Sequence, residues 1–254
     1  ISRSDWSSDV CSSDLVTYCK DAQKAIIRYV STNGNRVLTT DEVTGKSGEA
    51  IAYSTTSQIT EFKKQGYKLV SDEFTAGGAK VYDYDTARDQ VYTVTLSERV
   101  EPVNPDNPTP QPNTPVNPGQ PDSPRWPGTV ENLDNKESVS RTIHYVYEDG
   151  SKAKDDVVET LNFKRWSNVN LVTGHIDFQD WTTNDDTFDK VVSPTIAGYT
   201  ADKSEIPAVS GVQAKDQDRV ETVTYRKDAQ KAVIRYVSTN GNRVLTTDEV
   251  TGKS

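Results

Sequence analysis

Short stretches rich in β-branched and aromatic residues alternate with turn signals along the first hundred residues. Residues 24–31 have the sequence KAIIRYVS, which is typical of a strand. The Asn33-Gly34 dipeptide that follows favours a tight hairpin turn, and residues 36–40 supply the returning strand. Two further strands are predicted at residues 67–70 and 91–96.

One short helix is predicted between these strands. Thr55 and Gln58 have the spacing of a capping box, in which each side chain bonds a backbone amide of the other. Ile59 and Phe62 fall on one helix face, and Gly66 suits the left-handed position that ends a helix. The pattern therefore indicates an α+β, β-rich domain with one helix across a sheet.

The second half of the chain repeats this plan without a confident helix. Residues 143–146 and the Asp149-Gly150 turn correspond to the first strand and turn above, and Gly198-Tyr199 corresponds to Gly66-Tyr67. A Thr-rich strand again closes the domain, at residues 220–224. Longer strands are predicted in the middle, at residues 160–166 and 175–181.

A nearly identical segment occurs twice. Residues 16–47 and 223–254 match at 30 of 32 positions, and their first residues, Val16 and Val223, are 207 residues apart. This period is far longer than the roughly 20–50 residues of a solenoid unit, so it indicates an array of domains. Serial copies favour binding, because linked weak sites bind about 10²–10⁴-fold more tightly than one alone.

Proline is concentrated in one segment. Residues 101–128 hold 10 of the 12 prolines, which favours an extended polyproline II conformation. We expect a semi-rigid spacer here, of about 80 Å if fully extended; a ligand for a proline-binding domain is the alternative.

These features divide the chain into five parts. Residues 1–15 alternate Ser and Asp without apolar periodicity, and the reverse translation of residues 6–15 permits a sequencing-library adapter, so we interpret them as a disordered artefact; a disordered linker is the alternative. The other parts are a first module at 16–100 (with 16–21 as the tail of a preceding module), a Pro-rich linker at 101–137, a second module at 138–227 and the start of a further first module at 228–254.

Composition excludes several classes of function. The chain has 254 residues, a net charge of -9 and only 33% apolar residues, and it contains no run of Lys and Arg. A nucleic-acid partner is therefore not expected, because nothing would displace phosphate counterions. No stretch of 18 apolar residues is present, so we expect no membrane insertion. Without Met or a signal peptide, the chain is interpreted as an internal piece of a longer protein.

Several of these motifs resemble a known family in their order. Residues 27–34, 43–49, 66–67 and 90–95 are similar to the mucin-binding (MucBP) domain. The segments 141–146, 172–174, 198–201 and 223–227, together with Trp181, are similar to its companion mucin-binding module. Together they resemble one repeat of the Mub-type mucus adhesins of lactobacilli.

The resemblance implies elongated tandem β-grasp (ubiquitin-like) modules on an exported, cell wall-anchored protein. It implies host mucin glycoproteins as partners and, for some repeats, immunoglobulins. The signal peptide and anchor are absent from this sequence. A multivalent adhesin is thus the leading hypothesis; a passive cell-wall stalk is the alternative, and a glycosidase is a distant third.

A glycan-binding face needs aromatic rings for sugar C–H groups, surrounded by polar side chains. Tyr82 and Tyr84 lie two residues apart, on one face of a strand, and Trp166 and Trp181 lie in a module with few other large residues. These four rings are the candidate glycan-binding residues, although such rings more often complete small cores.

Catalytic and metal chemistry have weaker signals. Asp83, Asp85 and Asp89 are a candidate calcium cluster, but the segment lacks the central Gly and distal Glu of a helix-loop-helix site. His144 and His175, the only histidines, show no zinc-site or catalytic spacing. We therefore expect no catalytic residues, no cofactor and no enzymatic activity.

Overall fold

The computed structural model of the protein describes residues 19–253, in two compact units. The first unit runs to Leu133 and includes Ser167–Asp177; the second contains Asp134–Trp166 and the chain from Phe178 onward. Residues 1–15, interpreted above as an artefact, lie outside the described residues. The two units are described separately below.

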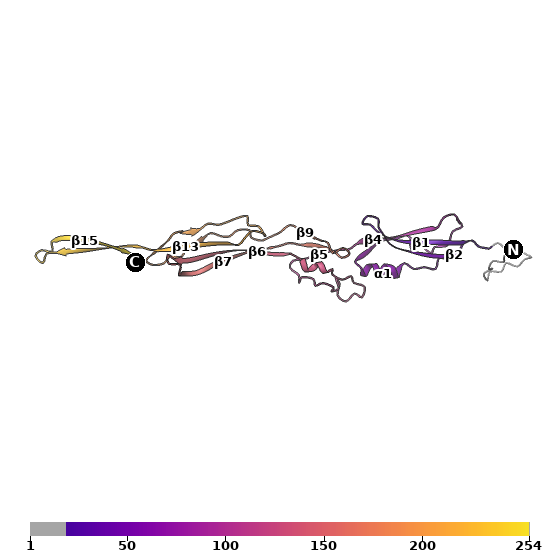
Figure 1. Ribbon diagram of the computed structural model, residues 1–254, viewed down its shortest axis with the longest axis horizontal. Helices are drawn as coiled ribbons and strands as arrows, with labels where there is room; N and C mark the ends of the chain where they lie inside the picture. Colours follow the sequence, from indigo (N-terminus) through magenta and orange to yellow (C-terminus); the bar gives the residue numbers. More distant parts are fainter. Residues whose placement is uncertain (1–18, 254) are drawn as a thin grey trace, which may run out of the picture. The chain divides into compact units, whose positions relative to one another are not determined.

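The first unit contains a mixed four-stranded sheet with one helix (Figure 1). The strand order is β2-β1-β4-β3, with β1 antiparallel to β2 and parallel to β4. The elements are β1 (Ala22–Ser31), β2 (Val37–Lys46), α1 (Thr56–Lys64), β3 (Tyr67–Asp72) and β4 (Gln90–Glu98). All four predicted strands and the predicted helix are confirmed, although each strand extends beyond its predicted bounds at one end or both.

Alternation along β1 places one set of side chains in the core. Ala25, Ile27 and Tyr29 are fully buried, and they pack with residues of β4 and α1 in a single cluster. The Tyr29 and Phe62 rings have centroids 5.6 Å apart. Alternate residues of a strand point to the same face, and residues three or four apart in a helix lie on the same side. The cluster therefore consists of one face of the sheet packed against the apolar side of α1.

The prediction for α1 fails at its N-terminal end and holds at its C-terminal end. The predicted capping box is wrong: Thr55 makes no side-chain bond to the helix, and its hydroxyl donates instead to the Asp72 carboxylate at 2.6 Å. The predicted left-handed Gly66 is confirmed, with φ of +94°. A β-carbon on Gly66 would also lie 2.8 Å from the Cβ of Leu171, so the turn needs glycine for two reasons.

The second unit repeats the strand arrangement of the first. Its main sheet has the order β11-β13-β6-β7, with β6 antiparallel to β7 and parallel to β13. Its strands are β6 (Lys136–Tyr147), β7 (Lys152–Lys164), β10 (Val191–Val192), β11 (Tyr199–Ala201), β12 (Glu205–Ile206) and β13 (Arg219–Lys227). In both sheets the first and last strands of the domain are the parallel central pair.

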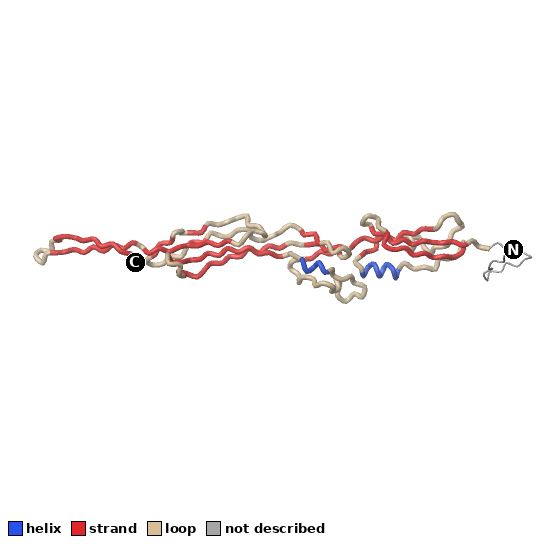
Figure 2. The backbone as a smooth tube through the Cα atoms, in the orientation of Figure 1, coloured by secondary structure: helices blue, strands red, loops and turns tan. Residues whose placement is uncertain are grey.

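No α-helix occurs among the described residues of the second unit, where strands and loops alternate (Figure 2). The strand predicted at residues 160–166 is the end of the longer β7. The one predicted at 175–181 is reduced to β9 (Ile176–Phe178), whose first two residues belong to the first unit. Two buried clusters support the main sheet, one around Phe163 and Phe188 and one around Tyr145 and Tyr225.

The proline-rich segment is not the extended spacer that its composition predicted. It begins with β5 (Val100–Val103), which pairs with β8 (Ser167–Asn170) in a three-stranded sheet completed by β9. It then folds back on itself through a bridge between Pro115 and Arg125 and ends in η1 (Gly128–Asn132), as Figure 1 shows beside β5.

Apolar burial explains this compact arrangement. Val103 and Val130 lie in one buried cluster with Val169 and Leu171, and Trp126 packs against it. Proline density alone does not reveal such a cluster, because its partners Val169 and Leu171 lie in β8 and just after it, far along the sequence. The second sheet also begins at Lys136, inside the predicted linker.

The duplicated segment forms the same hairpin twice. The strands β14 (Ala229–Val237) and β15 (Val244–Lys253) pair in the register of β1 and β2, including the irregularity after Tyr236 that matches the one after Tyr29. The environments differ: Ile27 is fully buried, whereas the corresponding Ile234 is 46% exposed.

Candidate functional site

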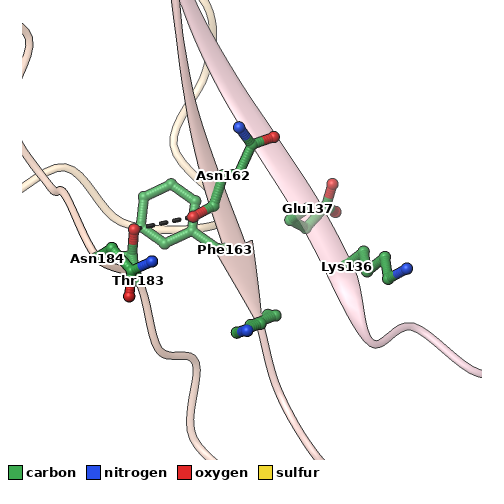
Figure 3. Close-up of a pocket in the computed structure, with 7 residues that line it drawn as sticks. Lys136, Glu137, Asn162, Phe163, Thr183 and Asn184 are labelled. Atoms are coloured by element: carbon green, nitrogen blue, oxygen red, sulfur yellow. Dashed lines mark hydrogen bonds between the residues drawn. The ribbon is translucent and has the colours of Figure 1, made fainter. Parts of the chain in front are cut away.

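Two adjoining pockets in the second unit form the candidate site. The first has a volume of about 240 Å³ and lies where β6 and β7 meet the loop that follows Trp181. Figure 3 shows Lys136 and Glu137 on one strand, Asn162 and Phe163 on the next, and Thr183 and Asn184 on the loop.

Backbone bonds hold this loop against β7. Lys164 and Thr182 exchange two backbone hydrogen bonds, at 2.9 and 2.8 Å. The Thr183 hydroxyl donates to the backbone oxygen of Asn162 at 2.8 Å, the contact drawn as a dashed line in Figure 3. The pocket wall is therefore fixed by the sheet before any ligand arrives.

The second pocket shares Phe163 and Thr183 with the first and has a volume of about 370 Å³. Its remaining lining comes from Trp181, Asp186 and the segment 212–215. We call the two together the Phe163 groove. Its floor is apolar, because Phe163, Val212 and Ala214 belong to one buried cluster.

Unused polar groups rim the groove. The side-chain amides of Asn162 and Asn184 make no hydrogen bond within the described part of the chain, and the same holds for the Gln213 amide. Each amide offers two donor hydrogens and an acceptor oxygen. Such groups match the vicinal hydroxyls of a sugar, each of which both donates and accepts.

Trp181 forms one wall of the groove and is held by stacked cations. The Arg165 guanidinium carbon lies 4.3 Å from the Trp181 ring centroid and 4.0 Å from that of Phe178. Asp134 fixes this guanidinium through its backbone oxygen at 2.8 Å and its carboxylate at 3.0 Å. Because Arg165 covers Trp181, the indole presents a wall rather than an open stacking platform.

Lys215 closes the far side of the groove. Its ammonium binds the Glu137 carboxylate, contacts that of Asp134 at 3.0 Å, and lies 5.5 Å from the Trp181 centroid. The hydrogen bonds that Lys215 donates to Glu137 and then to Asp134 raise its pKa, so it stays charged at neutral pH. The groove thus combines an aromatic wall, an apolar floor and both donors and acceptors, which suits a polyhydroxylated ligand.

The four rings predicted as glycan contacts have different surroundings. Tyr82 is only 3% exposed and lies in the core of the first unit, so its ring is closed to a sugar. Tyr84, by contrast, is 78% exposed, so the two tyrosines do not form a shared platform. Trp166 is 42% exposed and lines none of the pockets described here, which leaves Trp181 as the one predicted ring within the Phe163 groove.

The predicted calcium ligands do not converge. The carboxylate of Asp83 accepts from the amide of Asp85, and that of Asp85 accepts from the amide of Ala87. Asp89 pairs with Lys24 at 3.1 Å. Across residues 19–253, no three His, Cys, Asp or Glu side chains gather as a metal site would require.

The two histidines occupy unremarkable positions. His144 bonds the carboxylate of Asp156 through Nδ1 at 2.9 Å on an exposed part of the sheet. His175 follows the Thr173-Gly174 turn, where its amide is bonded to the Thr173 hydroxyl. Neither lines a pocket described above.

Sequence reasoning missed the polar residues of the groove. Asn162, Asn184 and Gln213 carry no motif, and they meet only because residues 181–186 return to the edge of β7. Trp181 was the one residue whose type could have indicated the groove, because a large aromatic ring in a polar loop usually packs over apolar surface.

Comparison with known families finds two domain models along the chain. Residues 23–98 match the mucin binding domain model, and residues 130–229 match the Muc B2-like domain model. No match to a curated protein was found. Within the described residues, no helix is long and apolar enough to cross a membrane.

Solved structures extend the match to the whole repeat. The crystal structure of Mub-RV is 26% identical, with a TM-score of 0.64, and the alignment covers 81% of this chain and 99% of that one. The type 2 repeat of the mucus binding protein MUB from Lactobacillus reuteri is 28% identical, with a TM-score of 0.52, and covers 81% of this chain and 100% of that one. The resemblance to a Mub-type repeat predicted from the sequence is confirmed.

Proposed function

We propose that this chain is a mucus-adhesin repeat that binds mucin glycans, because it matches a mucin binding domain and a Muc B2-like domain and aligns with Mub-RV over 81% of its length. The observation that carries the proposal is the match of residues 23–98 to the mucin binding domain. We further infer that both modules are β-grasp variants, supported by their common strand order around a parallel central pair.

The Phe163 groove is the proposed glycan site. Its two pockets are partly open to solvent, which suits a sugar that protrudes from a glycoprotein. Free amides of Asn162 and Asn184 would bond ring hydroxyls, while Trp181 would contact a sugar C–H face. Trp166 and Tyr84 remain proposed secondary contacts because both are exposed.

Weak binding by each repeat is sufficient in this proposal. The hairpin of β1 and β2 recurs as β14 and β15, so domain units follow one another along the chain. Linked sites gain about 10²–10⁴-fold in overall affinity when several engage together. Retention by two fused repeats should therefore exceed twice that of one, whereas simple proportionality would contradict this use of repetition.

The proposed setting is the outer surface of a bacterium, with the repeat carried on a cell wall-anchored protein. Mucin is the proposed partner there. Immunoglobulin binding and a passive stalk are the alternatives.

Retention on a mucin-coated sensor tests the proposal. The purified chain should be retained. Asn184→Ala should weaken retention about threefold to tenfold, because the side-chain amide that would bond the sugar hydroxyls is removed. The matched control is Asn107→Ala, which removes an exposed amide of the first unit far from the groove in sequence. Absence of retention by the unaltered chain would contradict mucin binding and favour the stalk.

A further inference from the structure

A third pocket, separate from the Phe163 groove and within the first unit, is lined by basic side chains. It has a volume of about 390 Å³ and lies between α1, β3 and the proline-rich segment. Lys63 comes from α1, Lys68 from β3 and Arg99 from the chain just after β4, while residues 120–124 form the opposite wall. Three cations from three separate elements therefore meet in a protein whose net charge is -9.

Two of these cations have no counter-ion. Neither Lys63 nor Lys68 has a carboxylate within ion-pairing distance among the described residues. Arg99 is paired with Glu101, and the one acid of the lining, Asp122, is 3.5 Å from Lys64. Even when these two ion pairs are taken into account, the positive charges of Lys63 and Lys68 remain uncompensated in the pocket.

The pocket walls are held in place without a ligand. The Arg99 amide donates to the Gly66 carbonyl, and its own carbonyl accepts from Leu171, at 2.8 and 2.9 Å. Across the pocket, the Ser123 hydroxyl accepts from the Asn117 amide at 2.8 Å and so fixes the loop. Pro124 is buried and Pro121 is exposed, which gives the wall rigid apolar surface beside the cations.

We propose that this pocket, lined by Lys63, Lys68 and Arg99, binds a glycan unit that carries an oxyanion. A carboxylate or a sulfate ester on a sugar would supply the missing counter-charge, and the volume suits one or two sugar rings. Pro121, which is exposed, would contact the apolar face of the ring. That the ligand is a glycan rests on the proposed function; the preference for negative charge rests on the pocket alone.

Binding of three sugars to the full chain tests the proposal by NMR titration. The probes are N-acetylneuraminic acid, 6-sulfo-N-acetylglucosamine and uncharged N-acetylglucosamine. At least one anionic sugar should bind about tenfold more tightly than the neutral one, with an affinity that falls as salt rises. The two anionic arms distinguish a carboxylate from a sulfate ligand.

Charge reversal locates the site. Lys63→Glu combined with Lys68→Glu should weaken the preferred anionic sugar by about tenfold or more, since both uncompensated cations become acids. Lys154→Glu, at an exposed lysine of β7 in the second unit, is the matched control and should leave the affinity within about twofold. Asp122→Asn should strengthen binding, because it removes the one acid of the lining.

The outcomes separate this proposal from the function proposed above. Equal affinity for charged and neutral sugars, or equal loss in the Lys154→Glu control, overturns the anion pocket even when mucin is retained. Loss of mucin retention by Asn184→Ala with unchanged binding of the anionic sugar supports two separate sites. A chain that binds an anionic sugar but is not retained by mucin leaves the pocket intact and contradicts the adhesin function.

Discussion

The Tyr82 ring lies directly against Gly45: a β-carbon built on Gly45 would be 2.1 Å from Cε2 of the ring. Gly45 belongs to β2, and Tyr82 lies in the core cluster of the first unit. The absence of a side chain at position 45 is therefore what lets the ring close over the strand. This contact explains why Tyr82 is a packing residue and not a sugar contact.

Gly45→Ala should destabilise the first domain by about 1–3 kcal/mol, because the new methyl group overlaps a buried ring that has no free space. The measurement is the midpoint of denaturant unfolding, followed by the circular dichroism of the full chain.

The duplication supplies a matched control for this change. Gly252 occupies the corresponding position in β15, where a β-carbon would have no atom within 4 Å. Gly252→Ala should leave the midpoint unchanged. Equal shifts for the two variants would indicate a general effect of alanine in this strand and would contradict a clash with Tyr82.

Arg141 is the largest fully buried side chain and should be essential for the second domain. It bonds the Glu159 carboxylate and the backbone oxygens of Pro207 and Asp189, and it lies 5.2 Å above the Phe188 ring. Arg141→Met leaves these partners unpaired, so we expect a loss of about 3–5 kcal/mol in the free energy of unfolding.

Arg219 is the control for this prediction because it is the register partner of Arg141 on β13 and is exposed. Arg219→Met should change stability by less than about 0.5 kcal/mol. If both variants lose a comparable amount of unfolding free energy, the cause is the loss of positive charge on the sheet and not the loss of the buried contacts of Arg141.

Tyr53 should make the first domain sensitive to alkali. Burial, followed by its hydrogen bonds to Asp41 and Tyr29, raises the pKa of Tyr53 well above the ordinary value of 10.0. The folded state therefore keeps a proton that the unfolded chain loses. Its contribution is fully present below pH 10 and declines as pH rises from 10 toward the folded-state pKa.

Unfolding midpoints measured at pH 8, 10 and 11 should show this decline, and the decline should be smaller in Tyr53→Phe. An unchanged pH dependence in that variant would show that other groups control alkaline stability. Tyr236→Phe, at a tyrosine that is 47% exposed in β14, serves as the control.

Trp181→Ala should reduce retention on mucin about threefold or more by removing the aromatic wall of the Phe163 groove. Trp166→Ala removes the other predicted indole, which lies outside the groove, and should have a smaller effect. The unfolding midpoint of each variant separates a binding loss from a folding loss. A larger effect of Trp166→Ala would place the glycan site elsewhere.

Local patterns predicted the parts of the fold that depend on neighbouring residues. The hairpin after Asn33-Gly34, the helix with its Ile59 and Phe62 face, and the left-handed Gly66 all follow from a few consecutive residues. The capping box failed because Thr55 finds a distant acceptor, Asp72, whose proximity depends on the path of β3.

The remaining differences also have long-range causes. A period of two places Tyr82 and Tyr84 on one strand face, but no regular strand forms there, so one ring is buried and the other is exposed. The proline-rich segment folds because Val103 meets Val169, a partner 66 positions further along the chain. The Phe163 groove likewise depends on a loop returning to β7, which no spacing in the sequence encodes.

The parallel pairing of β6 with β13 has a mechanical consequence. Chain enters the second domain through β6 and leaves through β13, and seven residue pairs join the two strands side by side. Traction applied to the chain ends would slide these strands along each other and strain all their bonds at once instead of opening them one by one. A domain with this geometry would therefore resist stretching along the chain.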